Sequence, residues 1–211
     1  MSTLSTLDDL YQRLGGIDPR RIRTHPAPGT ATVADAIDLH DREGILCELI
    51  EGVLVEKVMG VSESGLASAV IALLYAFVRP RNLGFVTAPD GTYELMPGLV
   101  RIPDVAFTNW DRVPGGRYPT APIPLLAPNL AVEVLSRSNT IGEMTLKRQD
   151  YFTSGVELVW EIDPELRTIR VYDSVTSVRT LRATDILDGG TVLPGFAVAV
   201  DEVFAELDRH A

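Results

Sequence analysis

The sequence has almost no cysteine. Cys47 is the only one among 211 residues, so no disulfide can form within the chain. The three histidines, His25, His40 and His210, are scattered and share no ligand spacing with Cys47, which argues against a Cys/His zinc site. These absences exclude a disulfide-stabilised scaffold and indicate a reducing, cytoplasmic location.

The chain also lacks an excess of basic residues. It has 19 Lys and Arg against 29 Asp and Glu, a net charge of −10, whereas proteins that coat nucleic acid are usually basic. A nuclease is not excluded, because an acidic metal site adds negative charge and the contact surface need only be basic locally. Three local basic clusters are present, of which the first is expected to be solvated surface: Arg20, Arg21 and Arg23; Arg79 and Arg81; and Arg137, Lys147 and Arg148.

Long hydrophobic runs and a leader segment are missing as well. The longest apolar run, residues 67–78, is too short to span a bilayer and is expected to form a buried helix. The start, "MSTLSTLDDLYQRLGG", has no basic segment ahead of an apolar one, so secretion is not expected. Leu4, Leu7, Leu10 and Leu14 lie near helical spacing and predict a short amphipathic helix. No membrane association is expected.

Two common catalytic motifs are absent, the Gly-x-Ser-x-Gly element and the phosphate-binding Gly-Lys-Ser/Thr loop. The length fits a single domain in which strands and helices alternate. The expected elements are a hairpin at 47–58, a helix at about 64–78 capped by Ser62 or Ser64, three strands within 84–108, an ordered loop at 111–129, a strand at 130–136, a helix at 140–155, strands at 156–164 and 168–173, and a final strand and helix within 192–207.

Two of these strands contain an unexpected carboxylate. Asp104 begins the apolar strand of "RIPDVAFT", and Glu133 lies between two valines in "LAVEVLS". A buried charge is costly unless it is paired or bound to a metal. The simpler interpretations are that Asp104 starts a turn after Pro103, and that Glu133 is on a solvated strand face.

Glu48, at the start of the hairpin, and Lys147, on the helix after the second of these strands, complete a candidate site. Carboxylates on rigid strands suit Mg²⁺ or Mn²⁺, and a nearby lysine can orient water or stabilise charge on a phosphate. Met144, Lys147 and Tyr151 fall on one helix face, which points Lys147 partly inward. The alternative is a surface ion pair between Glu143 and Lys147, worth only ~0.5 kcal/mol.

In order along the chain, "CELIEGVLVE", "RIPDVAFT", "LAVEVLSRSNT", "EMTLKRQDYFTSGVELVWEIDP" and "LPGF" resemble the Uma-two family of endonucleases, within the PD-(D/E)XK nuclease superfamily. The resemblance runs from about Glu48 to the C-terminus. It implies an α/β (α+β) fold, a restriction-endonuclease-like mixed β-sheet flanked by helices, in a domain over 41–211 after a helical or irregular extension over 1–40. It also implies hydrolysis of DNA phosphodiester bonds with Mg²⁺ or Mn²⁺ and, by family analogy, a homodimer with one site for each strand.

The resemblance assigns roles residue by residue. Asp104 matches the aspartate of the Pro-Asp motif, Glu133 the second acid, and Glu48 the acid before the hairpin glycine. The implied metal ligands are Asp104, Glu133 and the backbone carbonyl of Val134. The implied catalytic residues are Asp104, Glu133, Glu48 and Lys147.

Three positions depart from the family pattern. The superfamily lysine normally lies two residues after the second acid, where this chain has Leu135, and the family moves it to the following helix, at Lys147, with Tyr151 one turn later. The family often has a histidine at the start of its first core helix, where this chain reads "SESGLASAV". It also favours Asp where Glu143 stands.

Three functions remain open from the sequence. The leading hypothesis is a Mg²⁺-dependent endonuclease, the second is a catalytically inactive binding module that retains the nuclease fold, and the third is a hydrolase of a small phosphoester. Crowded carboxylates repel one another without a cation, so Asp104→Asn is expected to stabilise the metal-free protein. Tyr151 and Trp160 are expected to be mainly core residues.

Overall fold

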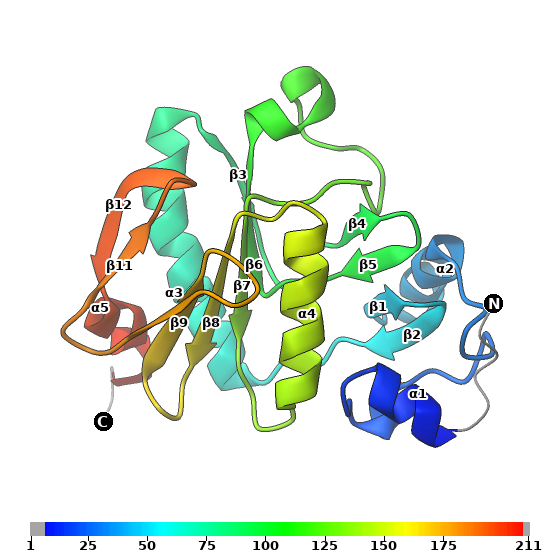
Figure 1. Cartoon of the computed structure of the whole chain (residues 1–211). Helices are drawn as coiled ribbons and strands as arrows, with labels where there is room; N and C mark the ends of the chain where they lie inside the picture. Colours follow the sequence, from blue (N-terminus) through cyan, green and yellow to red (C-terminus); the bar gives the residue numbers. More distant parts are fainter. Residues whose placement is uncertain (1–6, 209–211) are drawn as a thin grey trace.

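The computed structural model describes residues 7–208, whose strands form three sheets (Figure 1). The α-helices are α1 (Leu7–Arg13), α2 (Val33–Glu43), α3 (Val61–Val78), α4 (Ile141–Thr153) and α5 (Val200–Phe204). The strands are β1 (Cys47–Ile50), β2 (Val53–Glu56), β3 (Gly84–Thr87), β4 (Tyr93–Met96), β5 (Leu99–Arg101), β6 (Val105–Asn109), β7 (Leu130–Val134), β8 (Leu158–Asp163), β9 (Thr168–Tyr172), β10 (Val178–Leu181), β11 (Ile186–Gly189) and β12 (Leu193–Ala199). This mixture of helices and mixed sheet confirms the predicted α+β fold class.

The central sheet has six strands in the order β10-β9-β8-β7-β6-β3. Only β7 and β8 are parallel neighbours in it; the other pairs are antiparallel. A parallel pair needs a crossover connection, and α4 supplies it. In Figure 1, α4 lies in front of this sheet and α3 behind it, in agreement with the two core clusters that the sheet shares with them. Because both faces are covered, every residue of β7 is buried.

The predicted hairpin is present as β1 and β2. Glu51 and Gly52 connect the strands with φ angles of 49° and 75°, which is the left-handed backbone of a tight hairpin turn. These strands belong to a second sheet in the order β2-β1-β5-β4. The remaining pair, β11 and β12, forms a two-stranded sheet near the C-terminus.

The third strand predicted within 84–108 is in fact two strands in different sheets. β5 pairs with β1 and β4, whereas β6 pairs with β3 and β7. The break falls at Ile102, Pro103 and Asp104, which lie in neither strand. Proline has no N–H to donate to a sheet ladder, so the chain changes sheets there. This change of direction places Asp104 at the start of β6.

Helix α3 is longer than predicted and begins differently. It starts after Gly60 without a side-chain cap, so Ser62 and Ser64 lie inside the helix and cap nothing. Together with the 3₁₀ turn Arg79–Arg81, this helix is long and apolar enough to cross a membrane. Length and composition are weak evidence, because core helices of soluble proteins often meet the same two criteria. One face of α3 packs on the central sheet through Leu66, Ala67, Val70, Leu74 and Val78.

The segment before the hairpin contains α1 and α2 and packs on β1 and β2. Leu10, Leu14 and Ile17 of the predicted amphipathic helix and its following turn are buried against Val53 and Val55. Leu4, also part of that prediction, lies outside the described residues. Two strands after residue 173, β10 and β11, were not predicted, because their sequences are short and largely polar.

Trp160 in β8 is the largest fully buried side chain, with an exposed fraction of 0%, and its ring stacks on Phe196 with the centroids 5.8 Å apart. We predict that Trp160→Ala lowers the free energy of unfolding by about 3–5 kcal/mol, because it leaves a cavity in the main core. Urea unfolding measures this loss. The control Leu166→Ala, at a side chain that is 72% exposed, should change stability by less than about 0.5 kcal/mol; a loss of similar size in both variants would contradict the prediction.

Candidate active site

The two unexpected carboxylates lie close together, one just before β6 and the other in β7. β6 and β7 are antiparallel with Val105 paired to Val132, and Asp104, in the segment before β6, donates its N–H to the carbonyl oxygen of Val132. The side chains of Asp104 and Glu133 line the same small cavity. Asp104 is 3% exposed and Glu133 is 4% exposed. Glu133 is therefore not on a solvated face.

The row of charges continues across the sheet. Glu133 is paired with Glu161 on β8, and Glu161 with Arg170 on β9. Glu133, Glu161 and Arg170 thus share the face of the sheet that α4 covers, with Asp104 near Glu133 at the start of β6. Glu161 is fully buried and forms ion pairs with both Arg148 of α4 and Arg170.

Helix α4 places a lysine and a tyrosine over Glu133. Thr140 caps the helix by accepting the N–H of Glu143 at 3.0 Å. Lys147 Nζ is 3.1 Å from Glu133 Oε2 and 3.1 Å from Glu48 Oε1. Tyr151 donates its hydroxyl to Glu133 Oε1 at 2.5 Å. Tyr151 is a core residue, as expected, but it also orients the acid.

Glu48 lies deeper than the other acids. It is fully buried, and Arg101 Nη1 contacts its Oε2 at 2.8 Å. Arg101 also forms an ion pair with Asp150 of α4. Glu48 does not line the small cavity described below, and its contact with that cavity is through Lys147.

The surface ion pair considered for Glu143 and Lys147 is wrong. Glu143 is 1% exposed and pairs with Arg21 at 2.8 Å, while Lys147, one turn later on the same helix face, pairs with Glu48 and Glu133. Arg21 is only 9% exposed, so the expectation that its whole cluster is solvated surface is also wrong. This contact ties the N-terminal segment to the beginning of α4.

Sequence reasoning missed Lys57, which follows β2. Its Nζ is 2.6 Å from Asp104 Oδ1, 2.8 Å from the carbonyl oxygen of Ile102 and 3.9 Å from Glu133 Oε2. The signal was in the composition: the chain has seventeen arginines but only two lysines, Lys57 and Lys147. Both are in this cluster.

Burial and neighbouring charges move the carboxyl pKa values in opposite directions. Burial raises the pKa of Glu133 above its ordinary value, against the charges of Lys147 and Lys57. Burial acts in the same way on Glu48, but the charges of Lys147 and Arg101 outweigh it and hold its pKa low. Burial alone would lower the pKa of Lys147, but the charges of Glu133 and Glu48 outweigh burial, and the pKa is raised above its ordinary value. At neutral pH, Lys147 is therefore a donor and not a base.

A small cavity of about 20 Å³ opens between Asp104, Glu133, Lys57 and Lys147. It has room for about one water molecule. Val134 also lines it and donates its N–H to Asp104 Oδ2 at 2.6 Å. The N–H and C=O of a strand residue face the same neighbouring strand, so the carbonyl of Val134 is directed to the Asp104 side as well.

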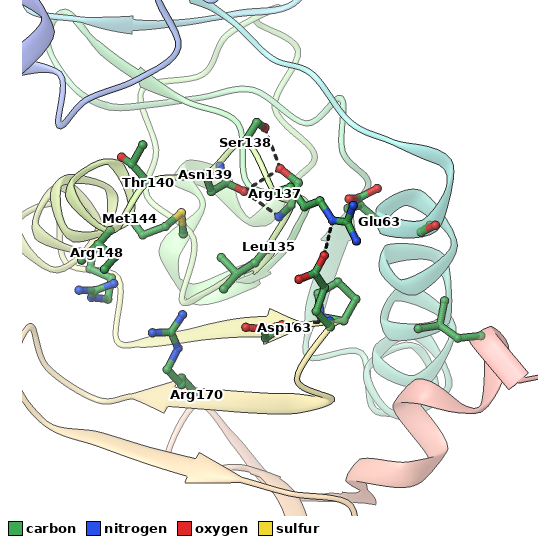
Figure 2. Close-up of a pocket in the computed structure, with 16 residues that line it drawn as sticks. Glu63, Leu135, Arg137, Ser138, Asn139, Thr140, Met144, Arg148, Asp163 and Arg170 are labelled. Atoms are coloured by element: carbon green, nitrogen blue, oxygen red, sulfur yellow. Dashed lines mark hydrogen bonds and ion pairs between the residues drawn. The ribbon is translucent and has the colours of Figure 1, made fainter.

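A much larger cavity, about 760 Å³, adjoins the small one (Figure 2). Arg137, Arg148 and Arg170 line it, and Figure 2 places Arg148 and Arg170 below Met144, with Arg137 on the loop between β7 and α4. Glu63 belongs to both cavities. The other residues that line both are Ser136, Ser138 and Asn139.

Comparison with known proteins agrees with this geometry. A family model described as Uma2, "Putative restriction endonuclease", matches residues 33–201. The chain belongs to the Uma2 family. The crystal structure of "a putative nuclease belonging to DUF820" from Anabaena variabilis has a TM-score of 0.68 with this protein at 21% identity, and the match covers 77% of this chain and 91% of that one. No curated protein matches. The resemblance stated from sequence and the restriction-endonuclease-like fold are both confirmed for this Uma2 protein.

The expected stabilisation by Asp104→Asn is reversed by the structure. Asp104 does not face other carboxylates without a cation; it is 3% exposed and accepts from Lys57 and from the N–H of Val134. We now predict that Asp104→Asn lowers the free energy of unfolding by about 1–3 kcal/mol in the presence of chelator, because Lys57 loses its ionic partner.

Urea unfolding in chelator measures the loss. The matched control is Asp188→Asn, which removes the partner of Arg179 at the surface and should cost at most about 1 kcal/mol. A stabilised Asp104→Asn protein would contradict this prediction and support repulsion between crowded carboxylates instead.

Proposed function

We propose that this Uma2 protein is a metal-dependent endonuclease that hydrolyses phosphodiester bonds of DNA. The observation that carries the proposal is the placement of Asp104 and Glu133 side by side at one small cavity, with Lys147 bound to Glu133. Family membership supports nuclease chemistry. The substrate and the metal are inferred from the chemistry of the site.

The donor set fits a hard divalent cation. Asp104, Glu133 and the carbonyl of Val134 would hold it, and all three ligands are oxygens. Within residues 7–208 no group of three or more acidic, histidine or cysteine side chains is close enough to hold a metal. Mg²⁺ suits such a site, because it commonly binds through one or two carboxylates and keeps several waters or substrate oxygens. When bound, it would polarise the phosphate and lower the pKa of a water molecule.

The chain's own residues supply orientation and positive charge. Glu48 and Glu133 hold the ammonium of Lys147 at the wall of the cavity, where it can donate to an attacking water or to the charge that develops on the phosphate. Tyr151 fixes the other oxygen of Glu133. These contacts preorganise the site before the substrate enters.

Three arginines of the large cavity offer contacts to a phosphate next to the site: Arg137, Arg148 and Arg170 line it together with Glu63, Asp163 and Glu165. Arg148 and Arg170 share one carboxylate, Glu161. The Nε atom of Arg148 is buried and has no hydrogen-bond partner among the described residues. Arg137 is 90% exposed at the side chain and pairs with Glu165, a surface contact that a phosphate can replace.

One observation favours the inactive binding module as a second candidate. Lys57 already neutralises Asp104 in the described structure, and a module without a metal would keep this arrangement. The module predicts DNA that is bound and left intact with any divalent cation.

Incubation of plasmid and linear DNA with the purified protein tests the proposal. We predict cleavage with Mg²⁺ or Mn²⁺ and none with chelator. Glu133→Gln and Lys147→Met should each reduce the cleavage rate by about 100-fold or more, because they remove a ligand or the charge that stabilises the transition state.

The matched control is Arg179→Gln, a surface change on β10 away from both cavities, which should cleave at the rate of the parent. DNA that stays intact with every divalent cation would overturn the nuclease proposal, and retained DNA affinity would then identify the binding module.

We further propose that the protein acts as a homodimer, because two antiparallel strands are cut most simply by two sites related by a two-fold axis. Light scattering at the concentration of the cleavage assay should give twice the mass of the chain. A monomer that cuts both strands would contradict this proposal, and a monomer that only nicks DNA would limit the activity to one strand.

A further inference from the structure

The ammonium of Lys57 lies between the two acids that are the proposed metal ligands. Its ammonium has three oxygen neighbours, from Asp104, Ile102 and Glu133, at 2.6, 2.8 and 3.9 Å. The side chain is only 9% exposed. An ammonium group in an all-oxygen environment is the closest equivalent that a protein has to a bound metal ion.

The residue type matters as much as the position. In a chain with seventeen arginines, Lys57 is one of two lysines. Arginine forms a rigid fork that holds a carboxylate in one geometry, whereas lysine is a compact charge on a flexible stem. Lys57 is therefore suited to release Asp104, while Arg101, with its contacts to Glu48 and Asp150, is suited to stay.

A divalent cation and Lys57 cannot occupy this place together. Both would bind the same oxygens of Asp104 and Glu133, within contact distance of each other, and like charges at that separation in a buried site repel strongly. The displaced ammonium has an acceptor nearby, because Glu63 lines the same small cavity. Glu63 forms no ion pair with any other described residue.

We propose that Lys57 is a tethered counter-ion that occupies the metal position of the Asp104–Glu133 pair, and that a divalent cation binds by displacing it. This inference rests on the proposed function, since it concerns the same metal site. The exchange keeps both carboxylates neutralised in the metal-free protein. Only molecules in which Lys57 has left the acids can bind metal, so the apparent metal affinity is the intrinsic affinity multiplied by the fraction of such molecules. The ammonium that is released remains at the cavity, beside the position of the substrate phosphate.

Calorimetric titration with Mn²⁺ compares the parent with Lys57→Met, which keeps the length of the side chain and removes its charge. We expect Mn²⁺ to bind Lys57→Met about tenfold more tightly or better. Lys57→Arg retains a charge at the site and should bind no more tightly than the parent. The matched control is Arg21→Gln, which removes one charge from the wall of the same cavity without touching Asp104 or Glu133; it separates displacement from a general change in electrostatic potential.

Selective labelling of the lysine ε-carbons gives a second measurement that is independent of activity and of the variants' stability. The two lysines give two NMR signals, and Lys57→Met assigns them. We expect saturating Mg²⁺ to shift and sharpen the Lys57 signal of the parent, over the same concentration range as metal binding, because the ammonium leaves a rigid buried contact. If Lys57→Met does not fold in chelator, the NMR titration of the parent protein tests the proposal by itself. Lys57→Arg then serves to assign the Lys57 signal.

The outcomes separate the two proposals. Equal or weaker Mn²⁺ binding by Lys57→Met, or a Lys57 signal that saturating Mg²⁺ leaves unchanged, overturns the displacement and leaves the nuclease proposal standing if the parent cuts DNA. Arg21→Gln binding Mn²⁺ as tightly as Lys57→Met overturns it as well. Absence of Mn²⁺ binding by the parent and by Lys57→Met overturns both proposals.

Discussion

The burial of three carboxylates in one row across the central sheet is the constraint on which the rest of the structure depends. Glu133 and Glu161 are paired on adjacent strands, Asp104 lies just before β6 beside the same cavity as Glu133, and all three are buried. Each buried carboxylate would cost several kcal/mol without a cationic partner. The parallel β7–β8 connection lays α4 directly over the row, and α4 contributes Lys147 and Arg148 to it. The fold and the site are thus consequences of the same charge balance.

The same constraint explains why segments far apart in the sequence meet at the site. Lys57 comes from the end of the hairpin, Asp104 from the point where the chain changes sheets, and Glu48 from the start of β1. The second sheet would be a simple cover for the N-terminal helices if it did not also carry Glu48 and Arg101. Glu48 and Arg101 pair with each other, and each also pairs with a residue of α4. These contacts hold the second sheet against α4 around Lys147.

Charges of both signs meet at the two cavities of this protein. The chain is acidic overall, and the larger cavity is lined by Arg137, Arg148 and Arg170 together with Glu63, Asp163 and Glu165. The two lysines have different partners at the smaller cavity: Lys147 is held between Glu48 and Glu133, whereas Lys57 pairs with Asp104.

The sequence by itself determined the strand that carries Glu133, the strand that follows Asp104, the hairpin and the family, because these depend on local patterns and on short motifs. It did not determine the break at Pro103, where one apolar run serves two sheets, or the deep burial of Glu48. Lys57 was missed for a related reason: its neighbours in the sequence form an ordinary strand end, and its partners are Asp104 and Glu133, far along the chain. Which cation neutralises which acid is decided only when the sheets pack, since a buried charge selects its partner by distance in space and not by spacing in sequence.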